Sequence, residues 1–524
     1  TTEQIVALTS SQIVSLSGLP IASLTTAQIA SLETTDLAVL KSTQIAAMTT
    51  DQVVALTTAQ AASLLTTQLA ALSVANLQAM ETTDLEALTT AQVAGLTTAQ
   101  AASLTTDQVV SLTTAQVAAL TTAQVAALTV AQIAAIETAD IPALTTAQVA
   151  ALTTAQVAAL TTDQLISLKT TQLVALKTTQ IAQGLTTDQV VALTTAQAVS
   201  LLTTQLAALS VANLQAMETT DLAALTTAQV AGLTTTQAAS LTTDQLVSLT
   251  TAQVEGLTTA QVAALTTVQV GALETTDVAV LTTRQLAALT TAQVAKGLTT
   301  DQLVALTTAQ VSAFTTAQMV ALTTDQVAAF ETADIASLKT TQLAALTTAQ
   351  VKQGLTTDQI ANLKTNQFAG LRTDQVAALL TDQILALSSA QVGAMTTGQL
   401  QALSTDQVAV LEAADVQALK TNQLRALNTA QIGVLGTDQI QALSSAQVAV
   451  LSSDAFAALD TAALGALTSS AVAGITTEQM GTLDTADIVA LNTDIANLST
   501  DAMAALVSAQ LAAFTTAQAA ALDS

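Results

Sequence analysis

One phrase of eight residues, repeated almost without interruption, constrains this chain more than any other feature. Residues 112–128 read LTTAQVAALTTAQVAAL, and close variants of LTTAQVAA fill nearly all of the 524 residues, about 65 times over. Self-similarity at a fixed period indicates one repeat array and overrides the inference of about three globular domains from length. We number each octad from its leucine, so that L-T-T-A-Q-V-A-A fills slots one to eight.

The period of eight excludes both regular continuous structures. Two turns of α-helix take about 7.2 residues, so an apolar position repeated every eight residues drifts by about 80° per octad and holds no single face. In a β-strand, slots one and six would point to opposite faces, and Ala and Gln are poor strand formers. One short helix per octad remains.

Each octad also has its own helix-start signal. Thr in slot two and Gln in slot five form a T-x-x-Q capping box, and the apolar residues of slots one and six stand at the N′ and N4 positions of a hydrophobic staple. Helices of about six residues are marginal alone, so the octads must stack for stability. We predict an all-α fold, a solenoid of very short helices, one per eight-residue repeat, that forms an elongated superhelical rod. The number of octads per turn and the handedness stay open.

The largest apolar residues mark the core slots. All five Phe and all seven Met occupy slot one or slot six, which predicts core packing and no ligand box. Thr, Gln and Ala are expected to form the exposed surface. Slot two also accepts residues that cap poorly, so either the cap shifts by one residue in those octads or slot two is an exposed corner. Examples are Leu65, Lys169, Glu218 and Arg372.

Breaks in the period add a second layer of organisation. The step between leucines grows to nine at three places, where the second leucine follows Gly184, Gly297 or Gly354. A glycine there suits a left-handed helix C-cap. The step falls to seven between Leu491 and Leu498. Pro142 removes a helix hydrogen bond, so its octad is expected to be distorted.

The array is expected to have two parts. Residues 1–450 form a regular octad-repeat solenoid, in which the block 65–122 recurs nearly verbatim at 202–259, an offset of 137 residues. Residues 451–524 contain divergent octads that often lack Gln. Terminal divergence is typical of a C-terminal cap, and drift of the repeat would give the same pattern.

The composition lacks most of the side chains that carry out catalysis or bind metals. The chain has no His, Cys, Trp or Tyr, so Asp and Glu are the acid–base candidates. We therefore expect no enzymatic activity, no catalytic, cofactor-binding or metal-binding residues, and no cofactor. The absence of cysteine fits either a reducing cytosol or a bacterial surface protein, and it does not choose between them.

Charge and hydropathy argue against two classes of partner. The net charge is −26 and the chain has 11 Lys and Arg residues, which disfavours nucleic acid and anionic membrane surfaces. Thr and Gln interrupt the apolar residues in nearly every octad, so no run of about 20 apolar residues could insert into a bilayer. The opening TTEQIVALTS is already in phase. We therefore expect no signal peptide, and a chain that is a processed product, a fragment or exported by another signal.

The acidic residues concentrate in slots two, four and five. There they interact favourably with the positive end of each helix, which accounts for most of the charge without a site. The sharper alternative is a calcium site where acidic octads adjoin, as at Asp374 and Asp382, although no calcium-binding motif supports it. Glu and Lys in the same slot of consecutive octads are expected to form surface ion pairs. These pairs are Glu33–Lys41, Glu331–Lys339 and Glu412–Lys420.

Two resemblances add to this reading. The segment LTTDQVVAL at 185–193 is similar to the helix-start segment of transcription-activator-like effector repeats. That family implies a period near 34 and a basic surface, so the likeness extends to a helix start and not to DNA binding. As a whole, the LTTxQVAAL octads resemble tracts of large secreted or surface proteins of bacteria. This resemblance covers nearly the whole chain and implies an extracellular or cell-surface scaffold, fibre or adhesin stalk.

Three functions are consistent with these observations. The leading hypothesis is a structural protein that assembles with copies of itself into an extracellular filament or surface layer, because a periodic, sparsely charged surface binds a copy in register. The alternatives are a monomeric stalk or spacer of a large adhesin, and a protein that binds ice or another surface through its Thr arrays.

Overall fold

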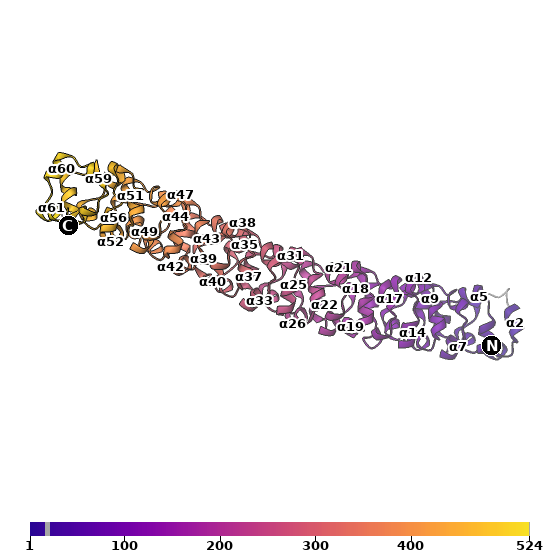
Figure 1. Ribbon diagram of the computed structural model, residues 1–524. Coiled ribbons are helices and arrows are strands. Elements are labelled where there is room, and N and C mark those ends of the chain that lie inside the picture. Colours follow the sequence, from indigo (N-terminus) through magenta and orange to yellow (C-terminus); the bar gives the residue numbers. More distant parts are fainter. Residues whose placement is uncertain (16–20, 523–524) are drawn as a thin grey trace. The chain divides into compact units, whose positions relative to one another are not determined.

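Short helices succeed one another along the whole described chain. The computed structural model describes residues 1–15 and 21–522, and these residues form helices and connecting turns without a strand (Figure 1). Regular octads hold one helix each, generally four to seven residues long. The predicted fold class, an all-α solenoid with one helix per octad, is confirmed.

The chain divides into two compact units, Thr1–Ala264 and Leu265–Ser524. The first unit contains α1 (Thr2–Val6) to α31 (Thr259–Ala264), and the second contains α32 (Thr267–Ala272) to α61 (Thr516–Leu522). The predicted change from regular to divergent octads at residue 451 lies inside the second unit, and as a domain boundary it stays a prediction.

The capping box sets the start of each helix. Before α18 (Thr154–Ala159), the Thr153 hydroxyl accepts the Gln156 backbone N–H at 3.2 Å, and Gln156 Oε1 accepts the Thr153 backbone N–H at 2.7 Å. Where slot two holds a poor cap, the helix start does not shift. Lys169 makes no side-chain cap, yet its backbone N–H still donates to Gln172 Oε1 at 2.6 Å. Slot two is therefore an exposed corner, and the exposed fraction of Leu65 is 51%.

Slots one and six form the core, as predicted. Val157 and Leu160, from those two slots, are both buried, and the Phe314 and Phe330 rings pack edge to face with centroids 6.2 Å apart. Core packing is confirmed for four Phe and six Met residues. Phe514 and Met503, near the end of the described chain, are half-buried.

Within each unit, most helices pack on the helix three positions before them. Thus α21 (Thr178–Gly184) packs against α18, and α47 (Thr397–Ala402) packs against α44 (Thr373–Ala377). Hydrogen bonds also reach the octad four before, as shown below, so one turn of the solenoid takes between three and four octads. Consecutive octads therefore differ in direction by roughly 90–120°.

Changes of helix type absorb the period breaks. The leucines that end the nine-residue steps donate to the carbonyl five residues earlier: Leu185 to Gln180 O at 3.2 Å, and Leu355 to Gln350 O at 2.9 Å. The segment Gln350–Gly354 is a π-helix, whose wider turn takes up the extra residue. The seven-residue step instead contains a 3₁₀-helix, Asn492–Asn497, whose tighter turn needs fewer residues.

The predicted left-handed glycine caps are wrong, because no described glycine has a positive φ. The glycines serve close packing instead. A Cβ on Gly184 would lie 3.0 Å from Val157 Cβ, and one on Gly354 would lie 3.1 Å from Val327 Cβ. The predicted distortion at Pro142 is confirmed, since its octad forms a short 3₁₀-helix, Ile141–Ala143.

Candidate functional site

The glutamines of slot five line the interior, where they join successive turns. From Gln52 to Gln447 their exposed fractions do not exceed 6%. The prediction that Gln forms part of the exposed surface is therefore wrong for this slot. The physical reason is that its amide finds hydrogen-bond partners on the preceding turn, which removes the cost of burying it.

Gln156 shows what each of these side chains does. Its Oε1 completes the capping box of its own helix, while its Nε2 donates to Val125 O at 2.8 Å and to Leu128 O at 2.6 Å. Val125 belongs to the octad four before and Leu128 opens the octad three before. In the second unit, Gln431 Nε2 donates to Leu400 O at 2.9 Å and Leu403 O at 2.8 Å. We call the recurring set of Nε2 bonds the glutamine ladder.

The glutamine ladder satisfies carbonyl groups that short helices leave without partners. The last four carbonyl groups of an α-helix accept no hydrogen bond within the helix, so most carbonyl groups of a six-residue helix need partners from elsewhere. Each Gln amide covers two of these carbonyls on the preceding turn. Sequence reasoning found the capping half of this role and missed the other. The available signal was the near-uniform Gln in slot five, where a cap alone would tolerate Glu as well.

Apart from the octad of Asp487, which has Asp in slot two, seven octads carry Asp instead of Gln in slot five, each with Glu in slot two. The Asp side chains are 1–4% exposed, while slot two lies at the exposed corner. In three of these octads a hydroxyl 26 residues earlier donates to Asp Oδ1 at 2.6–2.7 Å. The seven residues are Asp36, Asp84, Asp140, Asp221, Asp277, Asp334 and Asp415.

Burial changes the acidity of several of these carboxyl groups. Desolvation raises the pKa of Asp84, Asp277 and Asp334 above the ordinary value, and the negative charge of the slot-two Glu adds to the effect. The pKa of Asp487, in a similar Asp-x-x-Asp octad, is also raised by desolvation. Hydrogen bonds with the Thr58 side chain and with the Glu331 backbone lower the pKa of Asp84 and of Asp334, respectively. At Asp487, the hydrogen bond of the Asp484 backbone lowers the pKa and that of the Asp484 side chain raises it.

The structure does not bring together the acidic and basic residues that the sequence suggested. Asp374 pairs with Arg372 at 3.0 Å, which lowers the Asp374 pKa, and it has no such contact with Asp382. Arg372 also donates to Ala344 O and, at 3.3 Å, to Leu346 O of the preceding turn. No group of three or more acidic ligands occurs among the described residues. Calcium binding stays a prediction.

The three predicted Glu–Lys ion pairs are wrong. Their six residues all lie in the described ranges, and none of the pairs forms. Consecutive octads point in directions roughly 90–120° apart, so residues in the same slot of neighbouring octads do not face each other. Pairing across turns, as Arg372 shows with the octads before it, is the geometry that the solenoid offers.

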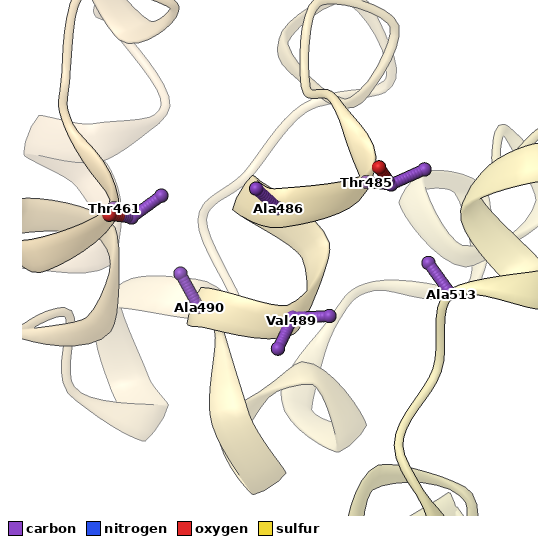
Figure 2. A pocket seen from close by; sticks show the side chains of 6 residues that line it. All are labelled: Thr461, Thr485, Ala486, Val489, Ala490 and Ala513. Atoms are coloured by element: carbon purple, nitrogen blue, oxygen red, sulfur yellow. The ribbon is translucent and has the colours of Figure 1, made fainter.

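One pocket lies in the second unit among helices of the divergent octads (Figure 2). It has a volume of about 560 Å³ and is lined by methyl groups and two Thr hydroxyls. Most of its lining comes from α58 (Thr485–Ala490), with Thr461 and Ala513 on either side. Because the lining contains no ionisable group, the pocket offers no acid, base or metal ligand.

Comparison with known proteins gives one informative match. The model of the ALTTAQ repeat family matches most of the chain, and no curated protein matches. Among solved structures, one described as a homology model of the full-length AP-3 complex in an intermediate open conformation has a TM-score of 0.15 and 10% sequence identity. The similarity covers 95% of this chain and 84% of that chain. The family matches are residues 29–66, 77–114, 110–135, 133–170, 214–251, 246–275, 270–308, 296–332, 327–365, 360–389, 381–412 and 408–445.

Proposed function

We propose that this chain, which belongs to the ALTTAQ repeat family, is a structural protein that assembles with copies of itself into an extracellular filament or surface layer. The proposal includes no catalytic role, cofactor or nucleic-acid partner. None of the described helices is both long and apolar enough to cross a bilayer.

Uniformity is the observation that carries this proposal. The same core slots recur in both units, and the capping box and ladder bonds recur in the regular octads of both, so most residues of a regular octad are committed to stacking. What remains exposed is mainly Thr and Ala in slots two to four. A surface that repeats every eight residues offers another copy many equivalent contacts, and little charge opposes them at any one point.

Some exposed apolar side chains recur at a spacing longer than one octad and are available for contact between copies. Val54, Val110 and Ile166 all occupy slot seven, are 41–42% exposed, and follow one another at intervals of 56 residues. Such a regular spacing supports an in-register lateral contact. Single exposed apolar residues are ordinary on a protein surface, so the argument rests on their period.

Electron microscopy of the purified protein at increasing concentration tests assembly. We expect filaments or sheets with a regular repeat, formed above a threshold concentration. A variant with Lys at positions 54, 110 and 166 should shift that threshold upward. Its matched control places Lys at Thr50, Thr106 and Thr162, exposed slot-three positions of the same octads, and separates the apolar effect from added positive charge. Single particles at every concentration would contradict self-assembly.

A monomeric stalk or spacer is the second candidate. Exposed carboxylates in slot four, such as Asp51, Asp107 and Asp163, contribute to a net charge of −26 that repels other copies. The same microscopy series discriminates between the two, since a stalk stays single. Binding to ice through Thr has less support, because the slot-two hydroxyls are engaged as helix caps. Thermal hysteresis of a solution of the protein would revive that alternative.

A further inference from the structure

Two buried carboxyl oxygens have no hydrogen-bond partner. They are Oδ2 of Asp84, on α10 (Thr82–Glu86), and Oδ2 of Asp334, on α40 (Thr332–Ser337). Both side chains are 2% exposed and occupy slot five, where most octads place the Gln of the ladder. Burying a polar atom without a partner is unfavourable, so the chemical state of these two groups needs an explanation.

The asparagines of slot five show what a side chain of this length reaches. Asn76 Nδ2 donates to Met48 O at 2.7 Å, and Asn213 Nδ2 donates to Leu185 O at 2.9 Å. In both cases the acceptor opens the octad three before, 28 residues earlier. A slot-five side chain that is one methylene shorter than Gln therefore still bridges directly to the preceding turn.

Aspartic acid has the same length as Asn, but only its protonated form has a hydrogen to donate. The corresponding carbonyls, 28 residues earlier, are those of Leu56 for Asp84 and Leu306 for Asp334. An ionised carboxylate would set a second acceptor against that carbonyl oxygen. We infer that Asp84 and Asp334 keep a proton in the folded chain. The stacking of their octads on the preceding turn is then most stable at acidic pH and becomes less stable as the pH rises.

The charged surroundings of both groups favour the neutral acid. Glu81 and Glu86 lie beside Asp84 in its own octad. Of the helices packed against α10, α7 (Thr58–Ser63) has no ionisable residue and α13 (Thr106–Val110) has Asp107. The hydrogen bond of the Thr58 side chain to the Asp84 carboxyl group lowers the Asp84 pKa, but burial is the larger effect and raises it. No cation on these helices compensates for ionisation.

Asp334 has a similar environment. Glu331 stands at the start of its octad. Of the helices packed against α40, α37 (Thr308–Val311) has no ionisable residue and α42 (Thr357–Ala361) has Asp358. Lys339, in slot two of the next octad, does not pair with Glu331. Desolvation raises the Asp334 pKa most, a hydrogen bond from the Glu331 backbone lowers it, and the Glu331 charge raises it further. The Asp84 pKa is likewise raised by burial and by the charge of Glu81.

The sign of the pH effect follows from the raised pKa values. The folded chain holds these protons more tightly than the unfolded chain, whose Asp pKa is about 3.9. The stabilisation is therefore complete below that pH and is lost as the pH rises through the folded-state pKa.

Amide hydrogen exchange on the full chain between pH 5 and pH 8 tests this inference, with rates expressed as protection relative to the unstructured peptide at each pH. The test variant is Asp84→Asn with Asp334→Asn, which keeps the side-chain length and supplies a permanent donor. The matched control is Asp51→Asn with Asp382→Asn, which removes the same charge from two exposed slot-four positions. Circular dichroism verifies that both variants are folded.

In the native chain we expect protection of α7, α10, α37 and α40 to fall with rising pH, approaching tenfold per pH unit across the titration of a single proton. The control should behave like the native chain, and the test variant should keep its protection at high pH. Protection in the native chain that does not vary with pH, or an equal fall in the test variant, would overturn the inference. Recovery of protection at pH 8 on adding millimolar calcium would also overturn it, in favour of a cation site.

Discussion

Regular octads and the divergent octads of residues 451–475 build the same solenoid, but with different numbers of hydrogen bonds between its turns. In the divergent octads, Ala455, Ala463 and Ala471 replace the slot-five Gln. Their helix caps persist, since the slot-two side chains still accept the slot-five N–H at 2.8–3.2 Å. Their core persists as well, with Phe456 fully buried. What they lack is the glutamine ladder.

This difference separates two layers of stabilisation. The apolar core and the helix caps are present in both regions, so they are sufficient to specify one short helix per octad. The ladder is added in the regular region, where it ties each turn to the one before it. Energy in a repeat array is close to a sum over repeats and their interfaces, so the two layers can be tested locally.

Removing a core side chain has the largest expected effect, and it should be equal in the two regions. Phe368→Ala in a regular octad and Phe456→Ala in a divergent one should each lower the local free energy of unfolding by about 3–5 kcal/mol, through lost burial and a cavity. Hydrogen exchange of the surrounding amides measures this loss. A much smaller cost at Phe456 would show that the divergent octads are not packed as the structure describes.

Removing one Gln of the glutamine ladder has an intermediate effect that should differ between the regions. Gln156→Ala leaves buried carbonyls of the preceding turn without their donor, and should cost about 1–3 kcal/mol of local stability. The reverse change, Ala463→Gln, adds a Gln to the glutamine ladder and should raise the local free energy of unfolding by about 0.5–1.5 kcal/mol. Hydrogen exchange on the preceding turn reports both changes. If both variants exchange like the native chain, the ladder contributes no stability.

Removing a helix cap has the smallest expected effect and should again be equal in the two regions. Thr153→Ala and Thr468→Ala each remove one side-chain acceptor from a helix start, at a cost of about 1 kcal/mol. Thr→Ser at the same positions keeps the hydroxyl and serves as the control. Local exchange rates that rise for Thr153→Ala and not for Thr468→Ala would mean that the divergent helices start elsewhere.

The parts of the fold that depend on one octad could be predicted from the sequence. The helix start at slot two and the core at slots one and six follow from the capping box and from the placement of Phe and Met. These features are local, because a capping box involves residues three apart. The distortion at Pro142 is local for the same reason.

The parts that depend on which octads stack could not be predicted in this way. Gln156 finds its acceptors 28 and 31 residues earlier, and the eight-residue phrase does not contain that distance. The Glu33–Lys41 pairing was wrong because it assumed that consecutive octads face each other. Gly184 was assigned to a left-handed cap because its true neighbour, Val157, belongs to the preceding turn.

Hydrogen exchange of the Gln side-chain amides, followed by ¹H–¹⁵N NMR, tests the ladder most directly. The slot-five groups, such as Gln156 and Gln431, should exchange slowly because their Nε2 hydrogens are buried and bonded to the preceding turn. Exposed glutamines such as Gln401, Gln417 and Gln441 should exchange at the rate of a free amide and provide the internal reference. Slot-five amides that exchange as fast as these exposed ones would contradict the central claim that glutamine joins the turns of this solenoid.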